Sequence, residues 1–285
     1  MKVVIMAIVR VLNPFLLLEW LQHHRNVGIS HFYLMDNKST VNCQELTKYY
    51  SDITWFVSDK DYIQIPSYNH MFPLISPKYD YVLIIDDDEF IQLDGKYNTI
   101  SEVIESFDSP DVIVLNWLMV GGQTRVRNLN TFLMEQVYLT NNHVNEHTKW
   151  LIRRDKIGMC KSPHWVELSD ETARCIDGTG ETCVSMGFWM PKTPDLRIYL
   201  MHYYVMSRND FLLKCERGKA DYEDKNSKEY DMERGLRLNQ ELTIPNFSMK
   251  RWIYKFYQQG YRTPTDLWRR AVEGIPPTPL DSVGF

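Results

Sequence analysis

Apolar runs and amphipathic segments alternate along the first part of the chain. Val3 to Val9 is a continuous apolar run, typical of a strand whose two faces are both covered. Asn13 and Pro14 can then supply the cap and the first residue of an amphipathic helix that ends near Gly28. This alternation predicts the α/β class, with a mostly parallel sheet flanked by helices.

The same pattern continues, less regularly, through the rest of the chain. Further strands are predicted at residues 30–35, 53–57, 81–85, 111–117, 149–153 and 197–205. Further helices are predicted at residues 43–50, 68–75 and 209–217. We expect a single domain over residues 1–240. Over residues 241–285 we expect a C-terminal helical extension and a proline-rich tail that pack on this domain.

The helical extension contains "MKRWIYKFYQQGYR", in which aromatic and basic residues are interleaved. A helix of this composition can lie on a membrane or bind an extended acceptor. Packing of the aromatic residues on the core is the alternative that we favour.

Composition and charge exclude several classes of protein. The chain has 285 residues, 44% of them hydrophobic, and a net charge of −5. It can bury a large core, and its acidic balance argues against a nucleic-acid partner. No apolar stretch approaches the roughly 18 to 20 residues that span a bilayer, so we expect a soluble protein. Five scattered cysteines favour free thiols, although a disulfide between Cys175 and Cys183 stays open. The scattered cysteines favour a reducing compartment, so we expect the protein to be cytoplasmic.

The stretch "YDYVLIIDDDEFIQLD" sets a buried strand directly against four acids, residues 86–89. Their mutual repulsion must be offset by water, hydrogen-bond donors or a cation. Asp86 and Asp88, two residues apart, can bring carboxylate oxygens to one divalent cation, and such hard ligands suit Mg²⁺ or Mn²⁺. A solvated acidic turn is the alternative.

Three segments of the chain resemble one family of enzymes. Asp86, Asp88, Glu89 and Phe90 match the D-x-D-E-F signature of GT-A glycosyltransferases of the family-92 type and of the related family-2 group. "LLLEWLQHHRNVGISHFYLMDNKST" resembles the family's opening segment at Glu19, Trp20, His24, Gly28, Asp36, Asn37 and Ser39. "HYYVMSRNDFLLKCERGKA" resembles its C-terminal segment at His202, Tyr203, Ser207, Phe211, Lys214, Arg217 and Gly218. The chain departs from the family at Leu12 and Asn13, where Asn-Glu is usual.

The resemblance implies a GT-A-like, Rossmann-like fold and a metal-dependent glycosyltransferase. Such an enzyme moves a sugar from a nucleotide sugar, expected here to be a UDP-sugar, to a hydroxyl of a glycan or glycoconjugate, with inversion. Negative charge then develops on the leaving diphosphate, where a cation stabilises it, while the sugar becomes positive. By resemblance, Asp86, Asp88 and His202 would hold Mn²⁺ or Mg²⁺, and Asp86 would also contact the ribose.

The nucleotide is expected over the carboxyl ends of the first strands. Its candidate contacts are Ala7, Val9, Arg10, Asp36, Asn37 and Asp86, with Lys149, Lys214 and Arg217 near the phosphates. An inverting transferase also needs a base for the acceptor hydroxyl, and Asp170 and Glu167 are the candidates for this catalytic role. His164 could approach the sugar or acceptor, or could be structural.

Two other functions use some of the same sequence features. A nucleotidyltransferase also uses strand-end acids and Mg²⁺, but we expect a glycine-rich phosphate loop after its first strand, which "AIVRVLNP" lacks. A non-catalytic module of the same fold that binds a nucleotide sugar or a glycan is the remaining alternative, since Leu12 and Asn13 depart from the family. Turnover would distinguish it from an enzyme.

Overall fold

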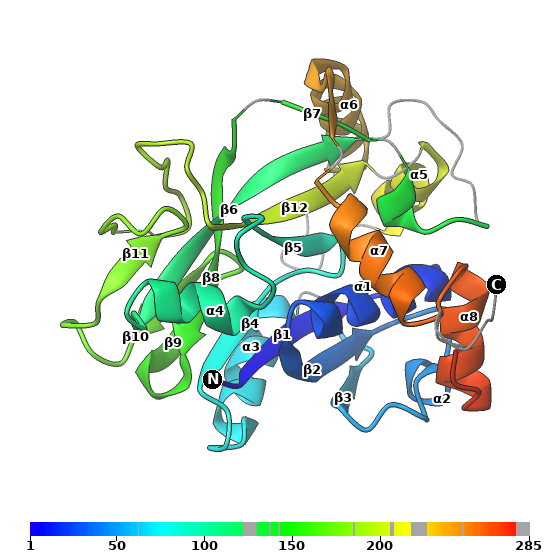
Figure 1. Ribbon diagram of the computed structural model, residues 1–285, viewed down its shortest axis with the longest axis horizontal. Coiled ribbons are helices and arrows are strands. Elements are labelled where there is room, and N and C mark those ends of the chain that lie inside the picture. Colours follow the sequence, from blue (N-terminus) through cyan, green and yellow to red (C-terminus); the bar gives the residue numbers. More distant parts are fainter. Residues whose placement is uncertain are drawn as a thin grey trace.

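The computed structural model describes residues 1–61, 63–121, 130–136, 138–141, 143–184, 186–205, 208–217, 227–246 and 248–277. Its strands are β1 (Val3–Val9), β2 (Ile29–Asn37), β3 (Ile53–Ser58), β4 (Tyr81–Ile84), β5 (Glu89–Leu93), β6 (Val112–Gly121), β7 (Tyr138–Thr140), β8 (Asn145–Arg153), β9 (Ile157–Ser162), β10 (Trp165–Leu168), β11 (Cys175–Asp177), β12 (Ile198–Val205) and β13 (Ile244–Asn246). Its helices are α1 (Pro14–Asn26), α2 (Cys43–Leu46), α3 (Gln64–Met71), α4 (Ile100–Ser106), α5 (Arg208–Arg217), α6 (Ser227–Glu241), α7 (Lys250–Gln258) and α8 (Pro264–Trp268) (Figure 1).

One large sheet organises the molecule. Its strands follow the order β13-β7-β6-β8-β4-β1-β2-β3, with β11 and β12 paired to β6 and β5 paired to β12. The strands β4, β1, β2 and β3 are mutually parallel, whereas β8 lies antiparallel between β4 and β6. The predicted α/β fold, with a mostly parallel sheet flanked by helices, is confirmed.

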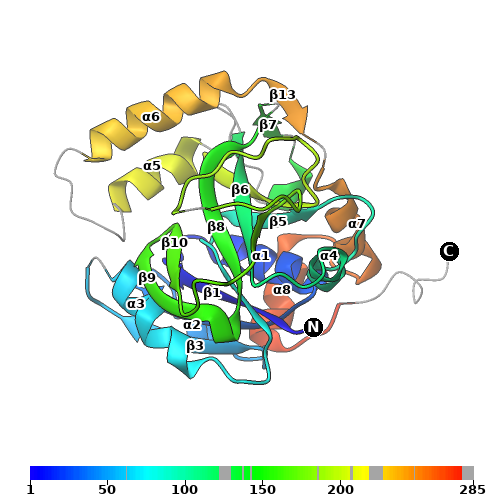
Figure 2. The ribbon, with the colours of Figure 1, turned by 90° about the vertical axis from the view of Figure 1, so that its left-hand side faces the viewer.

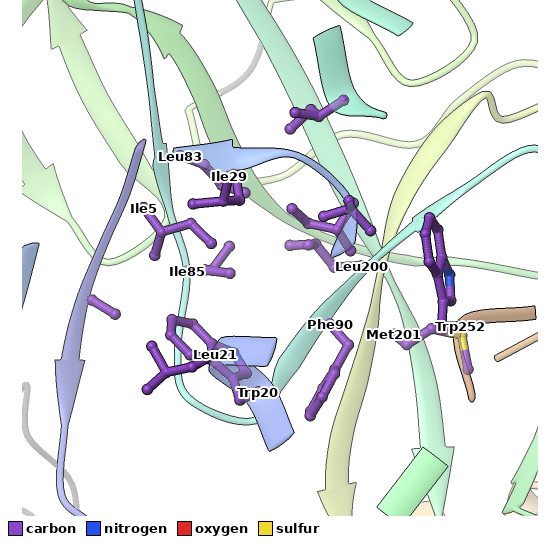
Figure 3. Packing of buried hydrophobic residues seen from close by; sticks show 14 of the residues in the cluster. Ile5, Trp20, Leu21, Ile29, Leu83, Ile85, Phe90, Leu200, Met201 and Trp252 are labelled. Atoms are coloured by element: carbon purple, nitrogen blue, oxygen red, sulfur yellow. The ribbon is translucent and has the colours of Figure 1, made fainter. Parts of the chain in front are cut away.

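Both faces of the sheet are covered. Helices α1, α4, α7 and α8 lie on one side, and α3 with the β9–β10 hairpin lies on the other (Figure 2). Alternate residues of β1 enter two different apolar clusters: Val3, Ile5 and Ala7 enter one, and Val4 and Met6 the other. A strand buried in this way needs apolar side chains at every position, which explains the continuous run. Figure 3 shows part of the larger cluster.

Local chemistry sets the bounds of α1. The Asn13 side chain accepts a hydrogen bond from the Phe15 backbone N–H at 3.0 Å, and Pro14 occupies the first turn. The chain then leaves the helix through Gly28, whose φ of +98° is accessible to glycine without strain. Asn13, one of the two departures from the family, therefore serves as the N-cap.

Helix α1 is tied to β5 by three buried side chains. Trp20 donates its indole N–H to the Glu89 carbonyl at 2.8 Å. His23 donates through Nε2 to the Ile91 carbonyl at 2.8 Å, and His24 accepts the Ile91 N–H at 3.4 Å. Burial lowers the pKa of His23 to about 3 and that of His24 well below its ordinary value, so both rings are neutral near pH 7. The helix thus fixes the strand that follows the four acids.

The C-terminal helix α7 packs on the core. Trp252 and Phe256 are fully buried, and the Trp252 indole donates to the Gln92 side chain at 2.8 Å. Arg251 and Lys255 donate to backbone carbonyls of neighbouring segments. Trp252 and Phe256 of α7 therefore pack on the core, which is the alternative that we favoured from the sequence. The domain boundary near residue 240 stays a prediction, and residues 278–285 of the tail lie outside the described chain.

Some predicted bounds differ from the structure. Helix α3 begins at Gln64 rather than near residue 68, and α2 is shorter than predicted. Strand β5 was not predicted, because its first residue, Glu89, is charged and the segment therefore did not resemble a buried strand. All five of its residues are buried. No helix in the described ranges is long and apolar enough to cross a membrane.

Glu19, which lies on α1 and begins the E-W-x-x-x-H pattern, offers a test of how this helix packs. Its buried carboxylate accepts the N–H groups of Leu133 and Met134 at 2.7 and 2.8 Å. Glu19→Gln should lower the free energy of unfolding by about 2 kcal/mol, because a charged acceptor is lost from buried donors. Urea denaturation would measure this, with exposed Glu105→Gln on α4 as control. An equal decrease in the free energy of unfolding in the two variants would contradict a stabilising role for the hydrogen bonds that Glu19 accepts.

Candidate functional site

The four acids form a tight turn between β4 and β5. The Glu89 N–H donates to the Asp86 carbonyl at 3.2 Å, and the Asp86 N–H donates to the Glu89 carboxylate at 3.0 Å. Asp88 and Glu89 are buried, whereas the Asp86 side chain retains 31% of its exposure. The turn lies at the carboxyl end of β4, beside β1, which is the edge where parallel sheets bind ligands.

Lys149 reaches this turn from β8. Its ammonium lies 2.7 Å from Asp86 Oδ2 and 3.7 Å from Glu89 Oε1, and its side chain is only 1% exposed. Burial opposes charge on both Lys149 and Asp86. Their mutual attraction outweighs burial, raising the pKa of Lys149 and lowering that of Asp86. Burial raises the pKa of Glu89 well above its ordinary value, despite Lys149, so Glu89 retains its proton more readily.

Asp88 has two partners of its own. Lys214, from α5, forms an ion pair with Asp88 Oδ2, and His202 Nε2 lies 3.5 Å from Asp88 Oδ1. Burial opposes ionisation of Asp88, but Lys214 and His202 hold its pKa well below the ordinary range. Burial lowers the pKa of His202 although Asp88 raises it, which favours a neutral imidazole. His202 arrives here because it pairs with Glu89 across β12 and β5.

The repulsion among the acids is thus offset by two ammonium groups. Asp86 faces Lys149, Asp88 faces Lys214, and Gln64 donates a further hydrogen bond to Asp86 at 3.3 Å. The structure brings together five residues singled out from the sequence, which are Asp86, Asp88, Lys149, His202 and Lys214. Gln64 was missed, since nothing in its local sequence indicates contact with the turn.

The cluster can be compared with the needs of a divalent cation. Across the described parts of the chain, no group of three or more His, Cys, Asp or Glu side chains is arranged to hold an ion. The donor chemistry still fits Mn²⁺ or Mg²⁺, because Asp86 and Asp88 favour their charged forms and His202 its neutral form. Lys214 occupies an oxygen of Asp88 that a cation could use. Metal binding stays a prediction.

The residues expected to contact the nucleotide lie along β1 and β2. Ala7 and Val9 are fully buried, and Arg10 follows at the end of β1. Asp36 accepts the Ser39 N–H at 3.0 Å, and Asn37 donates to the carbonyls of residues 58 and 60. These bonds shape the segments that follow β2 and β3, and β1 lies between β2 and β4 in the sheet. Nucleotide contact by any of these residues stays a prediction.

Other residues of the C-terminal family-like segment cannot be placed at the site. The side chain of Arg217 lies outside the described residues, as do Ser207 and Gly218. The role proposed for Arg217 beside the phosphates is therefore untested.

The two candidate bases lie on and just after β10. Glu167 is paired with Lys161 at 3.1 Å, and Asp170 is paired with Lys156 and accepts hydrogen bonds from Thr172. Burial is not what perturbs Asp170: the bond from Lys156 and those from Thr172 lower its pKa. A lowered pKa weakens a general base, and the catalytic role of both residues stays a prediction.

Aromatic residues beside the acids were not recognised as a group from the sequence. The Trp117 ring lies 4.3 Å from His202, 5.1 Å from His147 and 5.1 Å from His164, between ring centroids. His147 and Lys149 are two residues apart on β8 and therefore share one face of that strand. This spacing was the feature of the sequence that could have placed His147 beside Lys149. Trp117 could not be placed because its contacts depend on the pairing of β6 with β8 and β12.

Comparisons with known proteins add a family. The sequence model of one protein family, described as glycosyltransferase family 92, matches residues 12–176, which is more than half of the chain. No curated protein matches.

Solved structures give more distant likenesses. HddC from Yersinia pseudotuberculosis is 12% identical, with 76% of this chain and 99% of that chain covered and a TM-score of 0.38. A 4-diphosphocytidyl-2C-methyl-D-erythritol synthase from Anaerococcus prevotii is 9% identical, with 74% and 93% covered and a TM-score of 0.35.

Acid titration tests the environment of Asp88. Its folded-state pKa lies well below that of the unfolded chain, about 3.9. The stability that it contributes is therefore present above about pH 4 and is lost as pH falls through the folded-state pKa. We expect Asp88→Asn to lower the unfolding free energy at neutral pH and to flatten its decline below about pH 4.

Urea denaturation from neutral pH down to about pH 3 would measure both effects. Exposed Asp195→Asn is the matched control. A decline in Asp88→Asn as steep as that of the control would contradict the assigned environment.

Proposed function

The chain belongs to glycosyltransferase family 92, and from this membership we propose that it moves a sugar from a UDP-sugar to a hydroxyl of a glycan or glycoconjugate, with Mn²⁺ or Mg²⁺. As a glycosyltransferase it uses a nucleotide-sugar donor and a glycan acceptor. The uridine nucleotide, the cation and inversion at the transferred carbon are the proposed parts.

One observation carries this proposal. Asp86 and Asp88 lie at the carboxyl end of β4, within reach of two lysines and of His202. Such an edge is where open α/β sheets bind ligands, and the mixture of acids and ammonium groups suits a cation bound to a diphosphate. A merely solvated turn would not need a lysine that is 1% exposed.

Each residue has a proposed task at the donor. Asp86, Asp88 and His202 would hold the cation, which when bound stabilises charge on the leaving diphosphate as a Lewis acid. Lys149 and Lys214 supply positive point charges close to the phosphates. Lys214 is paired with Asp88. If a cation took the place of Lys214 on Asp88, the Lys214 ammonium would be available to a phosphate oxygen.

The remaining roles extend outward from the acids. Ala7, Val9, Arg10, Asp36 and Asn37 border the proposed nucleotide site at the ends of β1 and β2. Asp170 and Glu167 remain the proposed bases for the acceptor hydroxyl in an inverting transfer. A module that binds the same ligands without turnover is the alternative. It predicts nucleotide affinity without release of UDP.

Release of UDP tests the proposal. We expect the wild type to release UDP from one member of a panel of UDP-sugars when Mn²⁺ or Mg²⁺ is present. EDTA should abolish this release of UDP. Asp88→Ala should reduce the rate by about 100-fold or more, since it removes a proposed ligand of the cation. Asp195→Ala, an exposed change in the loop before β12, is the control.

The outcomes separate the alternatives. Release that is insensitive to EDTA, or equal in Asp88→Ala and in the control, would contradict the metal assignment. UDP binding with no release from any donor, even with a mixture of glycan acceptors added, would favour the binding module.

A further inference from the structure

Four rings form a cluster next to the acidic turn. Trp117 lies on β6 and His147 on β8, with His164 just before β10 and Phe188 in the segment between β11 and β12. Trp117 and His147 are stacked, with 5.1 Å between centroids and 6° between planes. His164 and Phe188 contact His147 edge-on, at 5.4 and 4.8 Å. These four residues are called the ring cluster below.

The ring cluster opens to solvent at one end. Trp117 is 9% exposed, whereas Phe188 is 56% exposed although its ring contacts both His147 and His164. Its neighbours Val184, Met186 and Met190 are 81%, 66% and 52% exposed. Val184, Met186, Phe188 and Met190 thus present four exposed apolar side chains in one short segment, which is a candidate binding surface.

The backbone holds Phe188 in place. The Thr148 N–H donates to the Gly187 carbonyl at 3.1 Å, and the Trp189 N–H donates to the Glu146 carbonyl at 2.8 Å. Gly187 has φ +105°, and an added Cβ would lie 3.0 Å from the Cβ of His164. A glycine is therefore needed for this close approach, and the exposed ring is anchored to β8 on both sides.

His164 presents a hydrogen-bond acceptor within the ring cluster. Its Nδ1 lies 3.1 Å from the Thr148 carbonyl, a partner that can only accept, so Nδ1 carries the proton and donates. Nε2 is then the nitrogen with the lone pair. Burial and the nearby Lys149 lower the pKa of His164 to about 4, so the ring is neutral near pH 7. A ligand hydroxyl could donate to Nε2.

The position of the ring cluster relative to the acids suggests its ligand. Trp117 contacts His202 at 4.3 Å, and the Lys149 ammonium lies 5.9 Å from the Trp117 ring. Across the sheet the order is β2, β1, β4, β8, β6. The proposed nucleotide contacts lie on β1 and β2 and the acids follow β4. The ring cluster on β8 and β6 is therefore on the far side of the diphosphate site.

We propose that the ring cluster is the subsite for the acceptor saccharide. A pyranose has an apolar C–H face and hydroxyl groups around its edge, so it suits an exposed aromatic ring beside a hydrogen-bond acceptor. The apolar face packs on Phe188 and His147, and one hydroxyl donates to His164 Nε2. His164 is a positioning residue in this arrangement. The inference rests on the proposed function, because it assigns the second substrate of the same site.

Saccharide binding tests the inference without turnover. The probes are methyl α- and β-glycosides of glucose, galactose, mannose and N-acetylglucosamine, observed by saturation-transfer NMR with and without UDP and Mn²⁺. We expect the wild type to bind at least one, at the millimolar affinity usual for a single sugar. Phe188→Ala should weaken that binding by about 10-fold, a loss of about 1.4 kcal/mol.

Matched variants separate a direct role from a structural one. His164→Ala should weaken binding, whereas His164→Gln, which can place an amide oxygen in the same space, should restore part of it. Tyr254→Ala on α7 removes a ring that is 60% exposed elsewhere and should bind as the wild type does. Circular dichroism and thermal unfolding verify that each variant is folded.

The outcomes for the ring cluster and for the donor site are distinguishable. Glycoside binding that depends on Phe188, in a protein that releases no UDP, would support the saccharide subsite and contradict the proposed sugar transfer. Release of UDP with no glycoside bound, or with equal binding by Phe188→Ala and Tyr254→Ala, would overturn the subsite and leave the transfer standing.

Discussion

Two ion pairs allow a buried strand to end in four acids. Lys149 lies 2.7 Å from Asp86 and is almost completely buried, and Lys214 is paired with Asp88. A buried ammonium or carboxylate without a partner would destabilise the fold by several kcal/mol, so each member of a pair depends on the other. The turn that joins β4 to β5 can therefore stay compact while it carries several charged side chains.

The rest of the fold holds this turn from behind. Trp20, His23 and His24 on α1 bond to the backbone of β5, and α7 packs Trp252 against Gln92 of the same strand. The family-like residues Trp20 and His24 thus support the turn through backbone atoms of β5, at Glu89 and Ile91. Support of this kind fixes the backbone of β5, while the carboxylates themselves are held by Lys149 and Lys214.

Local patterns predicted those parts of the molecule that depend on neighbours in the sequence. The buried β1, the Asn13 cap and the acids after β4 were all readable in this way. Strand β5 was hidden because its first residue is Glu89, which is buried against expectation. The burial of Lys149 and the meeting of Trp117 with His202 follow from pairings between distant strands, which no local pattern encodes.

The central claim is that the acids and lysines together form a cation-dependent diphosphate site. Isothermal titration calorimetry of UDP into the wild-type protein, with Mn²⁺ and with EDTA, tests it most directly. The account predicts that Mn²⁺ tightens UDP binding by about 10-fold or more, a gain of about 1.4 kcal/mol. Equal affinity in Mn²⁺ and EDTA, or no binding in either, would contradict it.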